Sequence, residues 1–249
     1  MGMFGNLTDT TQMEKATDSV GGGGQRLPSG VYDLKIKALY AGQSKGGASN
    51  LTIVADADGT EVSETIYYTN KKGENFYLDK NDKTKRHPLP GFTTVNDICL
   101  VVTGKPLAEQ DVEEKVVNIF DFESRKDIAT PVQCITAAHG ETFKAGILRV
   151  IEDKNEKNDA GDYVPTGKTY TTNAIDKVFQ ADDDRTVVEV LNGVESAEFL
   201  TAWLERNKGK DRDKSSKKAG NDNAGASGDG RPGAGNQDQA PKNSLFAKG

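Results

Sequence analysis

The chain has very few of the residues that metal centres, disulfide frameworks and many catalytic sites require. Among its 249 residues are two cysteines, two histidines and one tryptophan. Neither the pair Cys99 and Cys134 nor the pair His87 and His139 has the close CxxC or HxxxH spacing of a zinc site. We therefore expect no metal and no cofactor. A disulfide between the cysteines is allowed, but nothing in the sequence indicates one.

Long apolar runs and catalytic signatures are also missing. No stretch approaches the roughly 20 apolar residues of a membrane-spanning helix, and the first residues lack the apolar segment of a signal peptide. Gly167-Lys168-Thr169 resembles the end of a phosphate-binding loop, but that motif needs a glycine where this chain has Asp162. The sequence therefore predicts a cytoplasmic protein that is not an enzyme.

Both ends of the chain are poor in large apolar side chains. Residues 1–26 contain four consecutive glycines and no apolar period, and residues 208–249 are mostly Gly, Asn, Asp, Lys, Ser, Ala and Pro. Such segments cannot bury enough apolar surface to offset the loss of chain entropy. We expect a flexible arm at 1–26, one folded domain at 27–207 and a disordered, partner-binding tail at 208–249.

Charge is distributed unevenly along the chain. The whole chain carries −6, whereas residues 207–249 hold nine Lys and Arg against five Asp, so residues 1–206 carry −10. An acidic body argues against a general binder of double-stranded DNA, which usually shows a broad basic face. It permits a narrow basic groove, and the surrounding acids would discourage non-specific binding.

The alternation of apolar and polar residues predicts a mainly β domain. We expect strands at 31–40, 49–57, 61–78, 116–122 and 131–151, with a helix at 93–103 between the third strand and the fourth. This order fits an OB-like five-stranded barrel with an internal helix.

Three further elements are expected towards the end of the domain. Residues 154–169 are polar and contain glycine, which predicts a long hairpin loop, and residues 186–190 predict a last strand. Ser196 is expected to cap a C-terminal helix. The apolar stripe of that helix would consist of Phe199, Leu200, Trp203 and Leu204. A β-bulge is expected at Gly146.

What the sequence does contain is a mixture of aromatic and basic residues between Tyr67 and Phe92. Five aromatic residues and six Lys or Arg face only three acids, which gives the segment a charge of +3. Rings that stack on bases and cations that contact phosphates are what single-stranded nucleic acid requires. The alternative is a solvated basic hairpin whose rings are partly core.

Period-2 alternation divides these rings between two faces. It predicts that Tyr67 and Tyr77 are exposed and available for stacking, and that Tyr68 and Phe76 belong to the core. The full set of predicted DNA contacts is Lys35, Lys37, Lys45, Tyr67, Lys71, Lys72, Tyr77, Lys80, Lys83, Lys85 and Arg86.

The tip of the tail predicts a contact with another protein. Leu245 and Phe246 are the only large apolar residues after Leu204. An apolar dipeptide at the end of a polar tail can dock in a pocket of a partner. Lys248 would add a charge-assisted contact to an acidic surface.

Two long stretches of the chain resemble a known family. Residues 70–123, NKKGENFYLDKNDKTKRHPLPGFTTVNDICLVVTGKPLAEQDVEEKVVNIFDFE, and residues 155–179, NEKNDAGDYVPTGKTYTTNAIDKVF, are similar to single-stranded DNA-binding proteins of podophages that carry a virion RNA polymerase. The resemblance covers roughly residues 27–207. It implies an OB-type barrel, cooperative binding of single-stranded DNA, opening of hairpins, and roles in phage replication and recombination in the cytoplasm of the infected bacterium.

The same resemblance implies activation of host RNA polymerase at late promoters. The tails of other replicative single-strand binders usually end in an acidic run with a terminal aromatic residue, whereas the tail of this chain is net basic. A basic tip fits an acidic partner surface, such as one on host RNA polymerase or on a phage replication protein. Two rival hypotheses remain: a transcription activator that works mainly through its tail, and a virion β-protein with no role on nucleic acid.

Overall fold

The computed structural model describes residues 26–121, 124–158 and 163–216. The strands are β1 (Gly30–Gln43), β2 (Ser49–Ala57), β3 (Thr60–Tyr67), β4 (Phe76–Leu78), β5 (Arg86–Pro88), β6 (Glu113–Asp121), β7 (Lys126–Cys134), β8 (Thr142–Lys157), β9 (Tyr163–Phe179) and β10 (Asp211–Asp213). The helices are α1 (Pro90–Thr103), α2 (Val187–Leu191) and α3 (Glu198–Asn207), with short 3₁₀ turns at Leu107–Glu109 and Thr136–Ala138. The protein is mainly β, as the sequence predicts.

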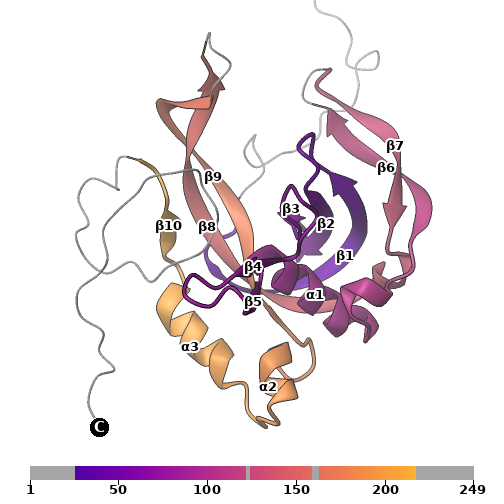
Figure 1. Ribbon diagram of the computed structural model, residues 1–249, viewed down its shortest axis with the longest axis vertical. Helices are drawn as coiled ribbons and strands as arrows, with labels where there is room; N and C mark the ends of the chain where they lie inside the picture. Colours follow the sequence, from indigo (N-terminus) through magenta and orange to yellow (C-terminus); the bar gives the residue numbers. More distant parts are fainter. Residues whose placement is uncertain (1–25, 122–123, 159–162, 217–249) are drawn as a thin grey trace, which may run out of the picture.

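One sheet contains every described strand except β4 and β5, which pair only with each other. Its central path is β10-β8-β1-β2-β3, with β9 on the other edge of β8, β7 on β1, and β6 on β7. All of these pairs are antiparallel except β10 with β8. The first part of β1 pairs with β8, and its end pairs with β7. Figure 1 shows that β1 is strongly curved, so that the β6–β7 and β8–β9 hairpins project on the same side.

The sheet is open, so the closed five-stranded barrel that the element order predicts is not confirmed. The strands β3 and β9 are two of its edge strands, and no backbone ladder joins them in the described part of the chain. A side chain connects them instead, because the backbone N–H of Ile175 donates to the carboxylate of Glu64 at 2.6 Å.

The main core lies on the concave side of the sheet. The alternation in β1 and β2 buries Leu34, Ile36 and Ile53, all at most 1 % exposed, while their neighbours along the strands face solvent. Helix α1 covers this core with Val95 and Ile98. Full burial of such side chains contributes about 1.5–3 kcal/mol each, so this alternation determines which face of the sheet is buried.

A second, smaller core lies behind β8. There Leu148 and Val150 pack against Trp203 of α3, and the Trp203 indole N–H donates to Asp176 at 2.7 Å. A Cβ at position 146 would lie 3.0 Å from the Trp203 ring, so only glycine lets α3 approach this closely. The register of β8 against β9 shifts at this glycine, which confirms the expected bulge.

Burial also perturbs two groups on α1. It raises the pKa of the Asp97 carboxyl to about 6, against the opposing effect of nearby Lys177. It also raises the pKa of the Cys99 thiol to about 12. Cys99 and Cys134 are both free and buried, so no disulfide joins them.

The prediction of a long loop at 154–169 is wrong, because β8 and β9 continue through most of this segment. Asn155 pairs with Pro165, and Lys157 pairs with Tyr163. The polar residues there lie on a hairpin that projects from the sheet, and neither face of this hairpin is buried. Its sequence therefore lacks the apolar alternation that indicates a strand.

The expected strand at 186–190 is also wrong. Thr186 is the N-cap of α2, where its hydroxyl accepts the N–H of Glu189 and the Glu189 carboxylate accepts the N–H of Thr186. This reciprocal capping box favours a helix over the strand propensity of the valines. The C-terminal helix is confirmed, but its N-cap is Ala197, and Ser196 instead donates to the side chain of Glu198.

Two boundaries also differ from the expected ones. Within 61–78 the sequence predicts a turn at residues 70–75 before a short strand at 76–78, and the structure has this turn between β3 and β4 but begins it earlier, at residue 68. The strand β10 lies beyond the expected domain end at residue 207 and pairs with β8 at Arg149, Val150 and Ile151. Residues 1–25 of the expected arm and 217–249 of the expected tail lie outside the described residues. None of the described helices is long and apolar enough to cross a membrane.

Candidate nucleic-acid interface

Tyr67 ends β3 at the edge of the sheet, opposite Asn50 of β2, and its side chain is 50 % exposed. The next residue, Tyr68, packs against the main core, as the alternation predicts. Helix α1 begins directly over this point. A Cβ at position 91 would lie 2.0 Å from the carbonyl oxygen of Tyr67, so the glycine there allows the start of α1 to approach the Tyr67 backbone this closely.

The turn after Tyr68 presents two lysines to solvent. Asn70 organises it: its side-chain oxygen accepts the N–H groups of Lys72 and Glu74, at 2.8 and 3.0 Å, and its amide donates to the Glu74 carboxylate. Gly73 adopts a φ of 80°, which a residue with a side chain rarely adopts. Because Glu74 is held inside the turn, Lys71 and Lys72 project outward.

The β1–β2 loop docks against this turn. The N–H of Ser49 donates to the hydroxyl of Thr69 at 2.8 Å, and the N–H of Tyr68 donates to the Ser49 carbonyl at 3.1 Å. The stem of Lys71 passes close to Gly46, where an added Cβ would lie 3.4 Å from its Cε. Lys45, exposed in the same loop, is therefore brought beside Lys71 although 26 positions separate them in the sequence.

The β4–β5 hairpin carries the second half of the aromatic-basic segment. Tyr77 is 50 % exposed and pairs with His87, with their ring centroids 5.3 Å apart. The Arg86 guanidinium lies 4.6 Å from the centroid of the half-buried Phe76 ring, a cation–π contact. Tyr77 is thus held by a ring on one side and open to solvent on the other.

The carboxylates of this hairpin accept hydrogen bonds from residues of its own loop. Asp79 accepts the N–H groups of Asn81 and Asp82 and contacts the His87 imidazole at 3.1 Å. These backbone hydrogen bonds, with a smaller effect of His87, lower the pKa of Asp79. Hydrogen bonds from Thr84 likewise lower the pKa of Asp82. Both carboxylates therefore shape the loop and stay ionised well below neutral pH.

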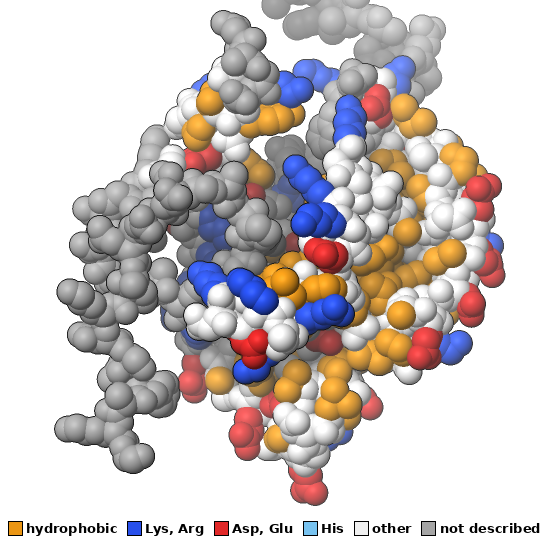
Figure 2. All heavy atoms as spheres, viewed as in Figure 1, with side chains coloured by type: hydrophobic (Ala, Val, Ile, Leu, Met, Phe, Trp, Pro, Cys, Tyr) orange, Lys and Arg blue, Asp and Glu red, His pale blue; other side chains and the backbone are white. Residues whose placement is uncertain are grey.

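Five lysines of the segment and the docked loop form no ion pair with a carboxylate in the described part of the chain: Lys45, Lys71, Lys72, Lys80 and Lys83. Lys85 lies 3.7 Å from Asp82. Figure 2 shows Lys and Arg side chains around the β4–β5 hairpin and above it, with apolar side chains between them. We name Lys45, Tyr67, Lys71, Lys72, Tyr77, Lys80, Lys83, Lys85 and Arg86 together the aromatic-basic surface.

Two of the predicted DNA contacts lie elsewhere. Lys37 bridges Asp56 at 3.5 Å and Glu61 at 3.1 Å, and its contact with Glu61 raises its pKa. Lys35 stands opposite Asp56 in the register of β1 and β2. Asp56 and Glu61 lie at the far end of the strand pair from Tyr67, about 20 Å away at 3.3 Å per residue. The structure therefore separates both lysines from the aromatic-basic surface.

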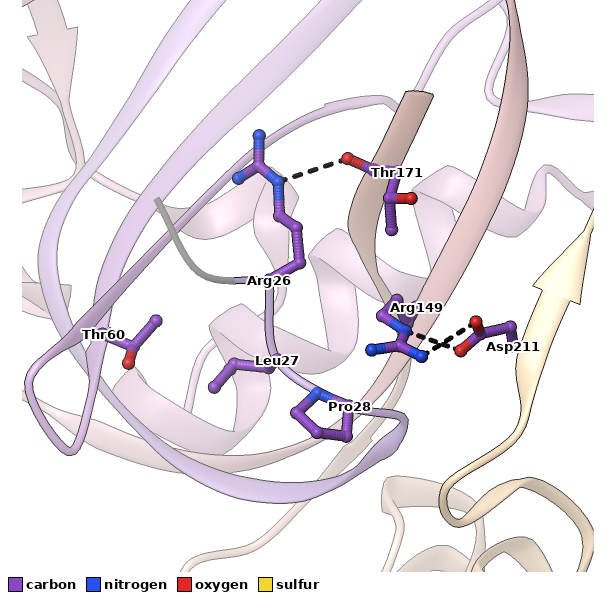
Figure 3. Close-up of a pocket in the computed structure, with 7 residues that line it drawn as sticks. All are labelled: Arg26, Leu27, Pro28, Thr60, Arg149, Thr171 and Asp211. Atoms are coloured by element: carbon purple, nitrogen blue, oxygen red, sulfur yellow. Dashed lines mark hydrogen bonds and ion pairs between the residues drawn. The ribbon is translucent and has the colours of Figure 1, made fainter. Parts of the chain in front are cut away.

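A shallow hollow of about 650 Å³ lies at that far end of β3, near Thr60 (Figure 3). Its two arginines are engaged: Arg149 forms a bidentate pair with Asp211, at 2.6 and 2.9 Å, and Arg26 donates to the carbonyl of Thr171. These contacts tie the start of the described chain and β10 onto the sheet. We therefore interpret the residues around this hollow as structural.

A second group of exposed rings, on the β8–β9 hairpin, was not predicted from the sequence. Tyr163 is 69 % exposed with Lys157 5.5 Å from its ring centroid, and Tyr170 is 48 % exposed. The Tyr170 hydroxyl donates to Glu152 at 2.9 Å. Knowledge of the β-pairing of this segment would have identified these rings, but that pairing is seen only in the structure. Carboxylates accompany the rings, so this hairpin lacks the basic character of the aromatic-basic surface.

Comparison of the sequence with protein-family models and with curated proteins finds no match. Among the described residues, no three His, Cys, Asp or Glu side chains converge in a way that could hold a metal ion. The geometry of the site offers two exposed rings and a set of solvated cations, carried by the end of β3, the turn after it, the β1–β2 loop and the β4–β5 hairpin.

Proposed function

We propose that the protein binds single-stranded DNA without strong sequence preference. The observation that carries the proposal is the docking of the β1–β2 loop on the turn after β3, which brings Lys45 beside Lys71 in the turn that directly follows the exposed Tyr67. Cations there would contact phosphates, and rings would stack on bases, which every base allows because every base has a π-face.

The proposal includes an OB-like arrangement for β1, β2, β3, β8 and β9. It is supported by the path β3-β2-β1-β8-β9, by the position of α1 between β3 and β8 in the sequence, and by the Glu64–Ile175 hydrogen bond between the edge strands. Oligonucleotide-binding OB-folds use the face of their second and third strands and the loop between the first two. In this chain those elements carry Tyr67 and Lys45.

Preference for unpaired strands would let the protein open hairpins by mass action, without ATP. Together with the family resemblance, this function would place the protein in phage replication and recombination in the bacterial cytoplasm. Contact with host RNA polymerase through Leu245, Phe246 and Lys248 belongs to the same proposal.

The test is binding of fluorescent oligo(dT) to ring variants of the full chain. Tyr67→Ala and Tyr77→Ala should each weaken binding by about 1–3 kcal/mol, roughly 5- to 150-fold, because each removes one stacking platform. Replacement of either tyrosine by Phe should retain most of the affinity. The matched control is Tyr170→Ala, which removes a ring of nearly equal exposure, 48 %, on the carboxylate-rich hairpin. If the three alanine variants bind equally well, the proposed surface is wrong.

A further inference from the structure

The β6–β7 hairpin stands apart from the rest of the sheet. Within the described residues, its backbone pairing with the sheet is limited to Tyr40 and Ala41 of β1, opposite the end of β7, and to the adjoining Ile135–Leu39 hydrogen bond. In the parts of the chain that are described, no strand pairs with the other edge of β6. Figure 1 shows the hairpin projecting at the side of the molecule, and Figure 2 shows apolar side chains along it.

The outer edge of β6 has few of the features by which proteins protect an edge strand. Such edges are usually short, charged, bulged or interrupted by proline. The nine-residue strand β6 is regularly paired with β7, and its central residues Val116 to Phe120 include neither charge nor proline. Val116 is 68 % exposed and Phe120 is 49 % exposed. By contrast, β7 carries Pro131. The edge of β6 is thus suited to pair with another strand.

The sequence of β6 is complementary to itself when two copies run antiparallel. With Asn118 on a twofold axis, Val116 stands opposite Phe120 of the second copy, and Val117 stands opposite Ile119. The same register places Lys115 opposite Asp121. A shift of two residues in one direction sets Glu113 against Asp121. A shift in the other direction sets Val117 against Asp121 and moves Lys115 opposite position 123, beyond the end of β6. Opposite charges across strands stabilise a pair, and like charges destabilise it, so this one register is favoured.

We propose that two copies of this chain associate through β6, as a twofold dimer whose central strands pair in the register centred on Asn118. A contact of this kind uses the same surface on both copies and closes at two. Lys115, which bonds Glu113 at 2.8 Å within one copy, would then lie between that carboxylate and Asp121 of the second copy. The inference is independent of the proposed DNA binding and is tested without DNA.

The first experiment uses cysteine cross-linking of the full chain under mild oxidation. In the proposed dimer the two Asn118 Cα atoms lie about 5 Å apart, within the range a disulfide spans. Asn118→Cys should therefore form a covalent dimer. The matched control is Ala129→Cys, at the position opposite Asn118 on β7, because two copies of it would lie about 14 Å apart. The native cysteines are at most 6 % exposed, so the natural chain gives the background level of cross-linking. Equal cross-linking of both variants, or of neither, would overturn the proposal.

The second experiment measures the dimer by sedimentation velocity over a concentration series. The natural chain should show a concentration-dependent dimer. Lys115→Glu should weaken association at least tenfold by placing like charges opposite one another, while Lys105→Glu, the same charge change at an exposed lysine near α1, should not. A chain that stays monomeric at every concentration contradicts the dimer, and an unchanged Lys115→Glu dimer contradicts the register.

Discussion

The salt dependence of DNA binding offers the most quantitative test of the aromatic-basic surface. Each phosphate contact contributes about 0.7 to the slope of log affinity against log salt for a single strand. The five lysines without an ion pair in the described residues would together give a slope of about −3.5. Between about 50 and 200 mM salt, that slope corresponds to about a 100-fold loss of affinity for oligo(dT).

The perturbation is the triple replacement of Lys45, Lys71 and Lys72 by Ala. It should reduce the slope by about 2, so that the same salt change costs only about 7-fold in affinity. The matched control is Lys37→Ala, because this lysine already bridges Asp56 and Glu61. It lies about 20 Å from Tyr67, beyond the screening length of about 10 Å in 0.1 M salt.

The assay is fluorescence anisotropy of labelled oligo(dT) at several salt concentrations, with thermal unfolding to verify that each variant is folded. The assignment of phosphate contacts to Lys45, Lys71 and Lys72 is wrong if the triple variant retains the natural slope while it is folded. It is also wrong if Lys37→Ala reduces the slope as much as the triple replacement does, because the phosphate contacts would then lie at the opposite end of β1.

Three further predictions concern stability and the tail. Gly91→Ala should lower the free energy of unfolding by about 1–3 kcal/mol, because the added Cβ would collide with the Tyr67 carbonyl oxygen. Urea titration measures this change. A stabilised variant would mean that the helix propensity of alanine, which favours it over glycine by about 1 kcal/mol, outweighs the collision. The native pKa of Asp97, about 6, lies above its unfolded value, so its contribution to stability is complete below about pH 4 and is lost as pH rises through 6. Asp97→Asn should therefore raise stability at about pH 8 by about 1–2 kcal/mol after allowance for partial exposure, but not at about pH 4, and equal curves at both pH values would contradict this. Double replacement of Leu245 and Phe246 by Ala should leave the thermal transition and DNA affinity unchanged while it abolishes pull-down of host RNA polymerase, and retained pull-down would show that the tip is not the anchor.

The sequence by itself determined the β character of the domain and the faces of its strands. Period-2 alternation identified β1 and β2, and it separated the exposed rings of Tyr67 and Tyr77 from Tyr68, because one face of each strand has to be buried. Apolar residues at helical spacing likewise identified α1 and α3. These signals are local, so they can be read without knowledge of the partner elements.

Tertiary structure alone decided which of the cations lie together. Lys37 and Lys71 look equivalent in the sequence, yet one is neutralised by acids of two neighbouring strands and the other projects beside a docked loop. The register of β1, β2 and β3 produces both outcomes, and register depends on pairing between residues distant in the chain. The outer part of the β8–β9 hairpin, residues 154–169, was predicted as a loop for a related reason. Among the described residues there, the two strands pair only with each other and neither face is buried, so the sequence shows no apolar alternation.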